Sequence, residues 1–380
     1  MNKSYYYKCI SCKRIFDKPF NRCFNCKGLI IVEYPYLKFE INKTGQGIWR
    51  YGYLLPAFNT IISKGEGLTP LIKIDKENNV YIKNEKYNPT GTYVDRSSAV
   101  IASYISENDI KRIGILYSED YTLSLAYYLN NRSIEIFVDD IMKMDLSELT
   151  KFLSMKISIK PNSYVNEGIN VFEYMNPLTI EGLKTILFEI YEKNANVENI
   201  VVPAETGILA FSLYKGLKEL CNGGLDVPYN VIAVMSRDVS QPNIIMNLKD
   251  IKIIKVDNEE IITSFVKLYE KGIKTKPLSA MSYIVAENLK NSVAIITMGF
   301  KTSSTFRVKK ETLRDNIMKI LKEKGPMTAY QIWNEYPHYT LRGIYKALKN
   351  MELRGEVEIS VKDKGLRKVK YYKVKRNLVF

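Results

Sequence analysis

Four of the five cysteines have the spacing of a metal site. Cys9 and Cys12 are separated by two residues, as are Cys23 and Cys26, and ten residues lie between the pairs. Each pair can point two thiolates at one ion, and two pairs complete the tetrahedron that zinc prefers. Four sulfur ligands leave no position for water, so we expect a structural zinc that folds residues 1–34 as a zinc ribbon. The alternative is that the four cysteines are left over from a metal site that no longer binds an ion.

The C-terminal end of the chain carries most of the net positive charge. The formal charge of the whole chain is +15, and residues 307–380 hold 19 Lys and Arg against 8 Asp and Glu, which leaves +11 there. Cations concentrated in this way are typical of proteins that bind a phosphate backbone. A solvated lysine-rich tail is the alternative.

The same region has the pattern of three short helices. Leu313, Ile317 and Ile320 recur with helical spacing and predict a first amphipathic helix. Thr328 opens a second helix and has Gln331 in the capping-box position. The third helix, residues 340–355, buries one apolar stripe and leaves cations on its opposite face.

Two alternating strands, residues 357–361 and 369–374, follow the third helix and are joined by a basic loop. This order resembles a winged helix-turn-helix, which implies that the third helix enters the major groove of double-stranded DNA. Docking on another protein is the alternative, and the charge favours nucleic acid. The residues expected to contact DNA are Thr340, Arg342, Tyr345, Lys346, Lys349, Lys362, Lys364, Arg367 and Lys368.

Residues 35–305 alternate apolar β-branched runs with amphipathic stretches, which predicts an α/β body with parallel sheets and flanking helices. Its expected strands are residues 112–116, 134–138, 199–203, 230–235, 252–256 and 292–297. Its expected helices are residues 121–130, 179–193, 207–220 and 259–271. A polar segment, residues 299–310, is expected to link this body to a domain at 308–380. The chain has no long apolar run and no secretory signal, so we expect a cytoplasmic protein without membrane contact.

Blocks of the body resemble those of threonine synthases. They are IWRYGYLLP (48–56), GEGLTPL (65–71), IKNEKYNPTGTYVDR (82–96), NPLTIEGLKTILFEI (176–190), VVPAETG (201–207) and IITMGFK (295–301). The resemblance implies the two-domain α/β fold of fold-type II pyridoxal-phosphate enzymes, with a small subdomain at about residues 97–175.

The residues that this family uses for chemistry are changed in this chain. By register, the family's Schiff-base lysine falls on Val94, which has no amine. The phosphate-binding glycine loop reads Ala204 to Gly207 and includes Glu205, whose charge opposes a phosphate. The loop that would hold a substrate carboxylate contains two acids, Glu119 and Asp120. These losses predict a pseudoenzyme without catalytic residues, for which no pyridoxal phosphate is expected.

We therefore expect a DNA-binding transcriptional regulator that forms a homodimer. Its body either serves only as a dimerisation scaffold or also senses a small-molecule effector, and the sequence leaves both roles open. The residues expected to line its ligand pocket are Val94, Ser118, Glu119, Asp120, Glu205, Thr206 and Thr297. Two alternatives remain. One is a pyridoxal-phosphate enzyme with a relocated lysine, and the other is a non-enzymatic assembly factor of the transcription machinery.

Overall fold

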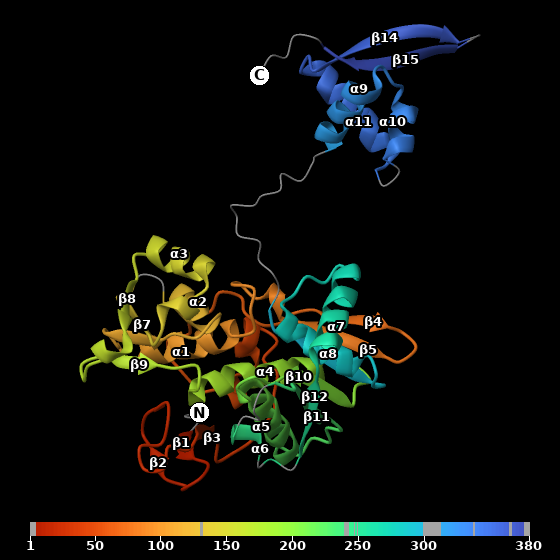
Figure 1. The fold of residues 1–380 in the computed structure, drawn as a ribbon. Coiled ribbons are helices and arrows are strands. Elements are labelled where there is room, and N and C mark those ends of the chain that lie inside the picture. Colours follow the sequence, from red (N-terminus) through yellow and green to blue (C-terminus); the bar gives the residue numbers. More distant parts are fainter. Residues whose placement is uncertain are drawn as a thin grey trace. The chain divides into compact units, whose positions relative to one another are not determined.

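The computed structural model describes residues 5–129, 132–238, 243–246, 248, 250–298, 313–336, 339–364 and 367–375. The chain divides into two compact units, Met1–Lys301 and Thr302–Phe380 (Figure 1). The linker expected at residues 299–310 lies outside the described ranges. None of the helices in these ranges combines the length and the apolar character needed to cross a lipid bilayer.

The first unit begins with a small antiparallel sheet in the order β2-β1-β3. Its strands are β1 (Tyr6–Cys9), β2 (Ile15–Phe16) and β3 (Ile30–Glu33). Tight turns follow Cys9 and Cys23, where the amides of Lys13 and Lys27 donate to the carbonyls of these cysteines at 3.0 and 2.8 Å. Both lysines have a positive φ, which allows the chain to turn back sharply over each cysteine pair.

A six-stranded sheet in the order β12-β11-β10-β13-β5-β4 forms the larger part of the body. Five strands are parallel and β4 runs antiparallel at the edge. Its strands are β4 (Leu71–Asp75), β5 (Val80–Asn84), β10 (Asn199–Pro203), β11 (Asn230–Ser236), β12 (Ile251–Val256) and β13 (Ser292–Ile296). All five residues of β13 are buried, as expected of a central parallel strand that helices cover on both faces.

A second parallel sheet, in the order β8-β7-β6-β9, forms the smaller part of the body. Its strands are β6 (Ile113–Leu116), β7 (Ile134–Val138), β8 (Ser158–Pro161) and β9 (Asn170–Phe172). The α/β body predicted from the sequence is confirmed, and the expected strands lie within one residue of those in the structure.

Helices flank both sheets of the body (Figure 1). They are α1 (Asp95–Glu107), α2 (Tyr121–Tyr128), α3 (Leu146–Ser154), α4 (Pro177–Glu192), α5 (Ile208–Asn222), α6 (Asn243–Met246), α7 (Asn258–Glu270) and α8 (Pro277–Ala286). Four short 3-10 helices are η1 (Gly47–Leu54), η2 (Glu85–Tyr87), η3 (Ile141–Lys143) and η4 (Asn162–Tyr164). Gly182 of α4 lies against α1, where an added Cβ would come within 2.3 Å of the Arg96 carbonyl oxygen. Only glycine therefore allows these two helices to pack so closely.

The described residues of the second unit, from 313 onwards, form three helices followed by an antiparallel hairpin. They are α9 (Leu313–Lys324), α10 (Ala329–Glu335), α11 (Leu341–Leu353), β14 (Val357–Lys364) and β15 (Arg367–Val374). Ile317, Ile332 and Leu348 are fully buried in a core of their own. Thr328 and Gln331 form the capping box expected at the start of α10.

Candidate functional site

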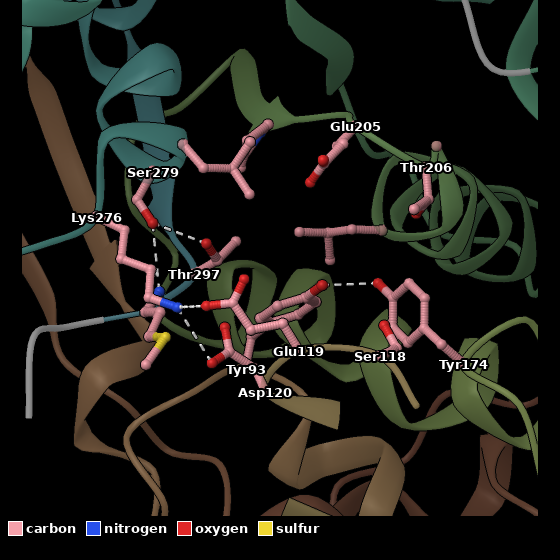
Figure 2. A pocket seen from close by; sticks show the side chains of 15 residues that line it. Tyr93, Ser118, Glu119, Asp120, Tyr174, Glu205, Thr206, Lys276, Ser279 and Thr297 are labelled. Atoms are coloured by element: carbon pink, nitrogen blue, oxygen red, sulfur yellow. Dashed lines mark hydrogen bonds and ion pairs between the residues drawn. The ribbon is translucent and has the colours of Figure 1, made fainter. Parts of the chain in front are cut away.

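A cavity of about 290 Å³ lies where strands of both sheets end (Figure 2). Residues 118–120 follow β6 of the smaller sheet, whereas 205–207 follow β10 and 297–298 follow β13 of the larger sheet. The carboxyl ends of parallel strands are the usual place for ligand sites in α/β proteins, because the loops there converge. The fold therefore brings together segments that are far apart in the sequence.

Six of the seven expected pocket residues line this cavity: Ser118, Glu119, Asp120, Glu205, Thr206 and Thr297. Val94 does not. It is only 1% exposed and lies at the start of α1, where its carbonyl accepts hydrogen bonds from the amide of Ser98 and the hydroxyl of Ser97. Val94 aligns with the lysine of the threonine-synthase blocks. Because Val94 is buried at this helix start, its side chain does not reach the cavity.

Lys276 is the lysine of the described residues that lines the cavity, and the sequence did not single it out. It lies just before α8, and its Nζ donates to Glu119 and, at 3.4 Å, to Oδ1 of Asp120. Figure 2 shows the side chain reaching across the cavity to these two carboxylates. Burial opposes charge on Lys276, but Asp120 and Glu119 outweigh it and hold the pKa of the ammonium above its ordinary value.

The segment before α8 is fixed beside the end of β13. The hydroxyl of Thr275 donates to the carbonyl of Met298 at 2.5 Å. Ser279, one turn into α8, is hydrogen-bonded to Thr297 at 2.8 Å. These contacts place Lys276 at the cavity. Lys276 follows no strand, so no sequence pattern marks it as a cavity residue; only the general tendency of cavities to contain charged residues could have suggested this position.

Two carboxyl groups near Lys276 have raised pKa values. Burial raises the pKa of Asp120 to about 6, with Glu119 adding to the effect and Lys276 opposing it. Burial likewise raises the pKa of Glu148 to about 7, although the Asp120 amide donates to it at 2.9 Å. Asp120 also has a φ of 65°, which places its backbone in the left-handed region directly before α2. The structure therefore holds Asp120 in an unusual position, close to an amine.

The other end of the cavity is formed by the start of α5 and by aromatic side chains. Thr206 and Gly207 precede the first turn of this 15-residue helix, whose amino end attracts anions. The hydroxyls of Tyr93 and Tyr174 are hydrogen-bonded at 2.7 Å beside it. Glu205 is exposed at the same end.

The four N-terminal cysteines form a site that fits a metal ion. Their Sγ atoms all lie within 4.8 Å of one another, and those of Cys9 and Cys26 are 3.5 Å apart. A tetrahedral zinc with Zn–S bonds of ~2.3 Å holds sulfurs about 3.8 Å apart. The cluster of Cys9, Cys12, Cys23 and Cys26 can therefore hold zinc as the sequence predicts.

Replacing Cys12 by serine should lower the zinc affinity of the purified chain at least tenfold, because one thiolate ligand is lost. Zinc per chain, measured after dialysis against a competing chelator, checks this. Cys221→Ser is the matched control, since Cys221 is exposed and lies outside the cluster. Equal zinc retention by both variants would show that the cluster is not the zinc site.

The residues expected to contact DNA occupy the second unit. Arg342, Tyr345, Lys346 and Lys349 are exposed on α11, opposite its buried residues. The hydroxyl of Thr340 accepts from the Gly343 amide at 3.1 Å and so caps the helix. Lys362 and Lys368 are exposed on the hairpin, and the side chains of Lys364 and Arg367 lie outside the described part of the structure.

Residues 62–243 match the family model for pyridoxal-phosphate dependent enzymes. The chain is 27% identical over 311 residues to a threonine synthase of Methanosarcina acetivorans, covering 73% of this chain and 76% of that protein. It is 25% identical over 309 residues to a threonine synthase of Methanocaldococcus jannaschii, covering 72% and 76% of the two chains.

Solved structures agree with this fold. Serine racemase from Dictyostelium discoideum matches with a TM-score of 0.52 at 17% identity, over 62% of this chain and 93% of that chain. A pyridoxal 5'-phosphate-dependent aspartate racemase matches with a TM-score of 0.51 at 12% identity, over 64% and 93% of the two chains.

Two predictions from the sequence are wrong in view of these relatives. The chain was expected not to be an enzyme and not to take pyridoxal phosphate, yet the family that it matches consists of pyridoxal-phosphate dependent enzymes. Both predictions rested on Val94 at the lysine position and on the acidic residues in the two loops, and an enzyme with a relocated lysine was the alternative. The fold brings one lysine, Lys276, to the cavity among the described residues. Residues 62–243 of this chain are thus similar to pyridoxal-phosphate dependent enzymes, and most of the body is similar to threonine synthases at modest identity.

Proposed function

We propose that the body is a pyridoxal-phosphate-dependent enzyme in which Lys276 supplies the amine that holds the cofactor. The observation that carries this proposal is the position of Lys276 in the cavity at the strand ends. The remaining lining residues fit such a group in part. The amino end of α5 suits the phosphate, and the paired hydroxyls of Ser279 and Thr297 suit the ring nitrogen. Glu205 lines the same end of the cavity, and its carboxylate opposes the phosphate.

Bound pyridoxal phosphate supplies an electron sink that stabilises a carbanion next to a substrate amine. The residues around it must then manage protons. To hold the cofactor, Lys276 would need its Nζ uncharged, because an ammonium has no free electron pair. The ion pairs with Glu119 and, at 3.4 Å, with Asp120 raise the pKa of the Lys276 ammonium and so keep its proton in place. These carboxylates would therefore have to be displaced from Nζ before the amine is free.

The proposal is tested on the purified full chain mixed with pyridoxal phosphate. We expect a visible absorption band that borohydride bleaches, because condensation of Nζ with the aldehyde releases water and hydride then fixes the bond. Peptide mapping should place the added mass on Lys276, at about one label per chain. A colourless protein with no added mass would overturn the proposal.

We also propose that the second unit is a winged helix-turn-helix that binds double-stranded DNA. The observation that favours this is the exposed cationic face of α11, where Arg342, Lys346 and Lys349 lie opposite a fully buried apolar stripe. A helix presented in this way can enter the major groove, with exposed Lys362 and Lys368 of the hairpin meeting phosphates. If the chain is a dimer, two such helices would lie about 34 Å apart on successive turns of a palindromic site.

Reversing the charge of Arg342 and Lys346 to glutamate should weaken duplex binding about tenfold to a hundredfold. The slope of log affinity against log salt should also fall by about one for each lost phosphate contact. A fluorescence-anisotropy titration with duplex DNA at several salt concentrations measures both. Lys322→Glu, an exposed change on α9, is the control that should leave affinity near that of the wild type. Unchanged duplex affinity in the double variant would refute DNA binding through α11.

A further inference from the structure

The ribbon at residues 5–34 carries an exposed aromatic cluster. Phe20 is 40% exposed and Phe24 is 55% exposed, and their ring centroids lie 5.8 Å apart. Buried Phe16 packs edge-on beneath Phe24, at 5.1 Å between centroids. Phe16 also packs edge-on against Phe20, at 5.8 Å between centroids, so the three rings form one cluster. Exposed apolar groups gathered in this way on a very small fold indicate a binding surface.

The segment that carries the cluster is rich in exposed cations. Five exposed residues between 13 and 27 are positively charged, against the single carboxylate of Asp17 in the same stretch. They are Lys13, Arg14, Lys18, Arg22 and Lys27. The guanidinium of Arg14 lies 4.8 Å from the ring centroid of Phe24, so charge and aromatic surface adjoin directly. Four thiolates with one Zn²⁺ would carry −2, which reduces this positive excess without cancelling it.

The segment that carries Phe20 is anchored on its other side. The side-chain amide of Asn21 donates to the carbonyl of Val171 at 2.8 Å, and that of Asn176 donates to Oδ1 of Asn21, also at 2.8 Å. Asn176 is fully buried and caps α4. The loop between the two cysteine pairs is thus held from behind by the body, and the rings of Phe20 and Phe24 are presented on a fixed platform.

We propose that this surface, formed by Phe20, Phe24 and the adjoining Arg14 on a cation-rich loop, binds single-stranded nucleic acid. Flat exposed rings offer stacking sites for bases, and adjoining lysines and arginines follow the phosphates, which is how single strands are bound without base pairing. A duplex does not fit, because its bases are already stacked on one another. The charge of the surface also disfavours a basic protein partner. None of its residues lines the cavity or belongs to α11, so it adds an activity that neither proposed function needs.

The test measures binding of the full chain to a fluorescent single-stranded oligonucleotide of about twelve thymidines, in the presence and absence of excess duplex DNA. Replacing both Phe20 and Phe24 by alanine should weaken single-strand binding at least tenfold, since each base–aromatic stack contributes a factor of about 5 to 150. Duplex binding should be unchanged in this variant. The Arg342→Glu, Lys346→Glu variant should show the reverse pattern.

Matched controls separate a lost contact from a lost fold. Tyr36→Ala removes an aromatic ring that is 88% exposed at a position outside the cluster, and it should bind as the wild type does. The phenylalanine variant should retain its zinc, which shows that the ribbon remains folded. Single-strand affinity equal to that of the wild type in a zinc-loaded double variant would overturn the proposal. So would the failure of wild-type protein to bind the oligonucleotide at low salt, which would leave a protein as the partner of this surface.

Discussion

Replacing Lys276 by arginine should abolish covalent labelling of the chain by pyridoxal phosphate and borohydride. Arginine keeps the positive charge and can still pair with Glu119 and Asp120, so the loop that carries these residues should stay in place. Its guanidinium remains protonated at any pH at which the protein is folded and therefore cannot attack an aldehyde. The label per chain, measured by intact mass, should fall from about one to near zero.

Lys274→Arg is the matched control for this experiment. Lys274 is two residues away, lies with its Nζ 5.9 Å from the ring centroid of Tyr269, and does not line the cavity. We expect labelling of this variant to equal that of the wild type. If Lys276→Arg is labelled as fully as the control, the amine lies elsewhere, and peptide mapping would identify it.

Replacing Arg96 by methionine should lower the free energy of unfolding of the body by about 3–5 kcal/mol. Arg96 is fully buried on α1, and its guanidinium donates to both oxygens of Glu85, at 2.7 and 2.9 Å, and to both oxygens of Glu189. Without it, two buried carboxylates would share the single ammonium of Lys83. The cost is that of leaving buried charge without its partner.

The pKa of Glu189 shows how strongly this pairing acts. Burial by itself would raise that pKa, yet Arg96 and Lys83 together lower it to about 2. Urea unfolding followed by circular dichroism measures the loss of stability in the variant. Arg112→Met is the same substitution at an exposed position and should change stability by less than about 0.5 kcal/mol. Comparable unfolding midpoints for the two variants would show that the buried ion pairs of Arg96 do not stabilise the body.

The zinc ligands and most of the secondary structure follow from the sequence, because both depend on short-range patterns. Two residues between cysteines suffice to point both thiolates at one ion, wherever the ribbon lies. The strand at 199–203 is recognisable from a continuous apolar run, and α10 from the Thr328 and Gln331 capping box. Six of the cavity residues were also expected, because the chain resembles threonine synthases block by block and the loops of those blocks indicate the ligand site.

Only the tertiary structure brings the amine of Lys276 to the cavity. Lys276 precedes a helix and lies 156 positions after Asp120 in the chain, so no local pattern joins the two residues. They meet because two separate sheets pack with their strand ends facing one cavity, and because Thr275 is bonded to the end of β13. Register with a family can indicate where a lysine is missing. Whether another lysine reaches the same cavity depends on contacts between distant segments, and only the folded chain brings these segments together.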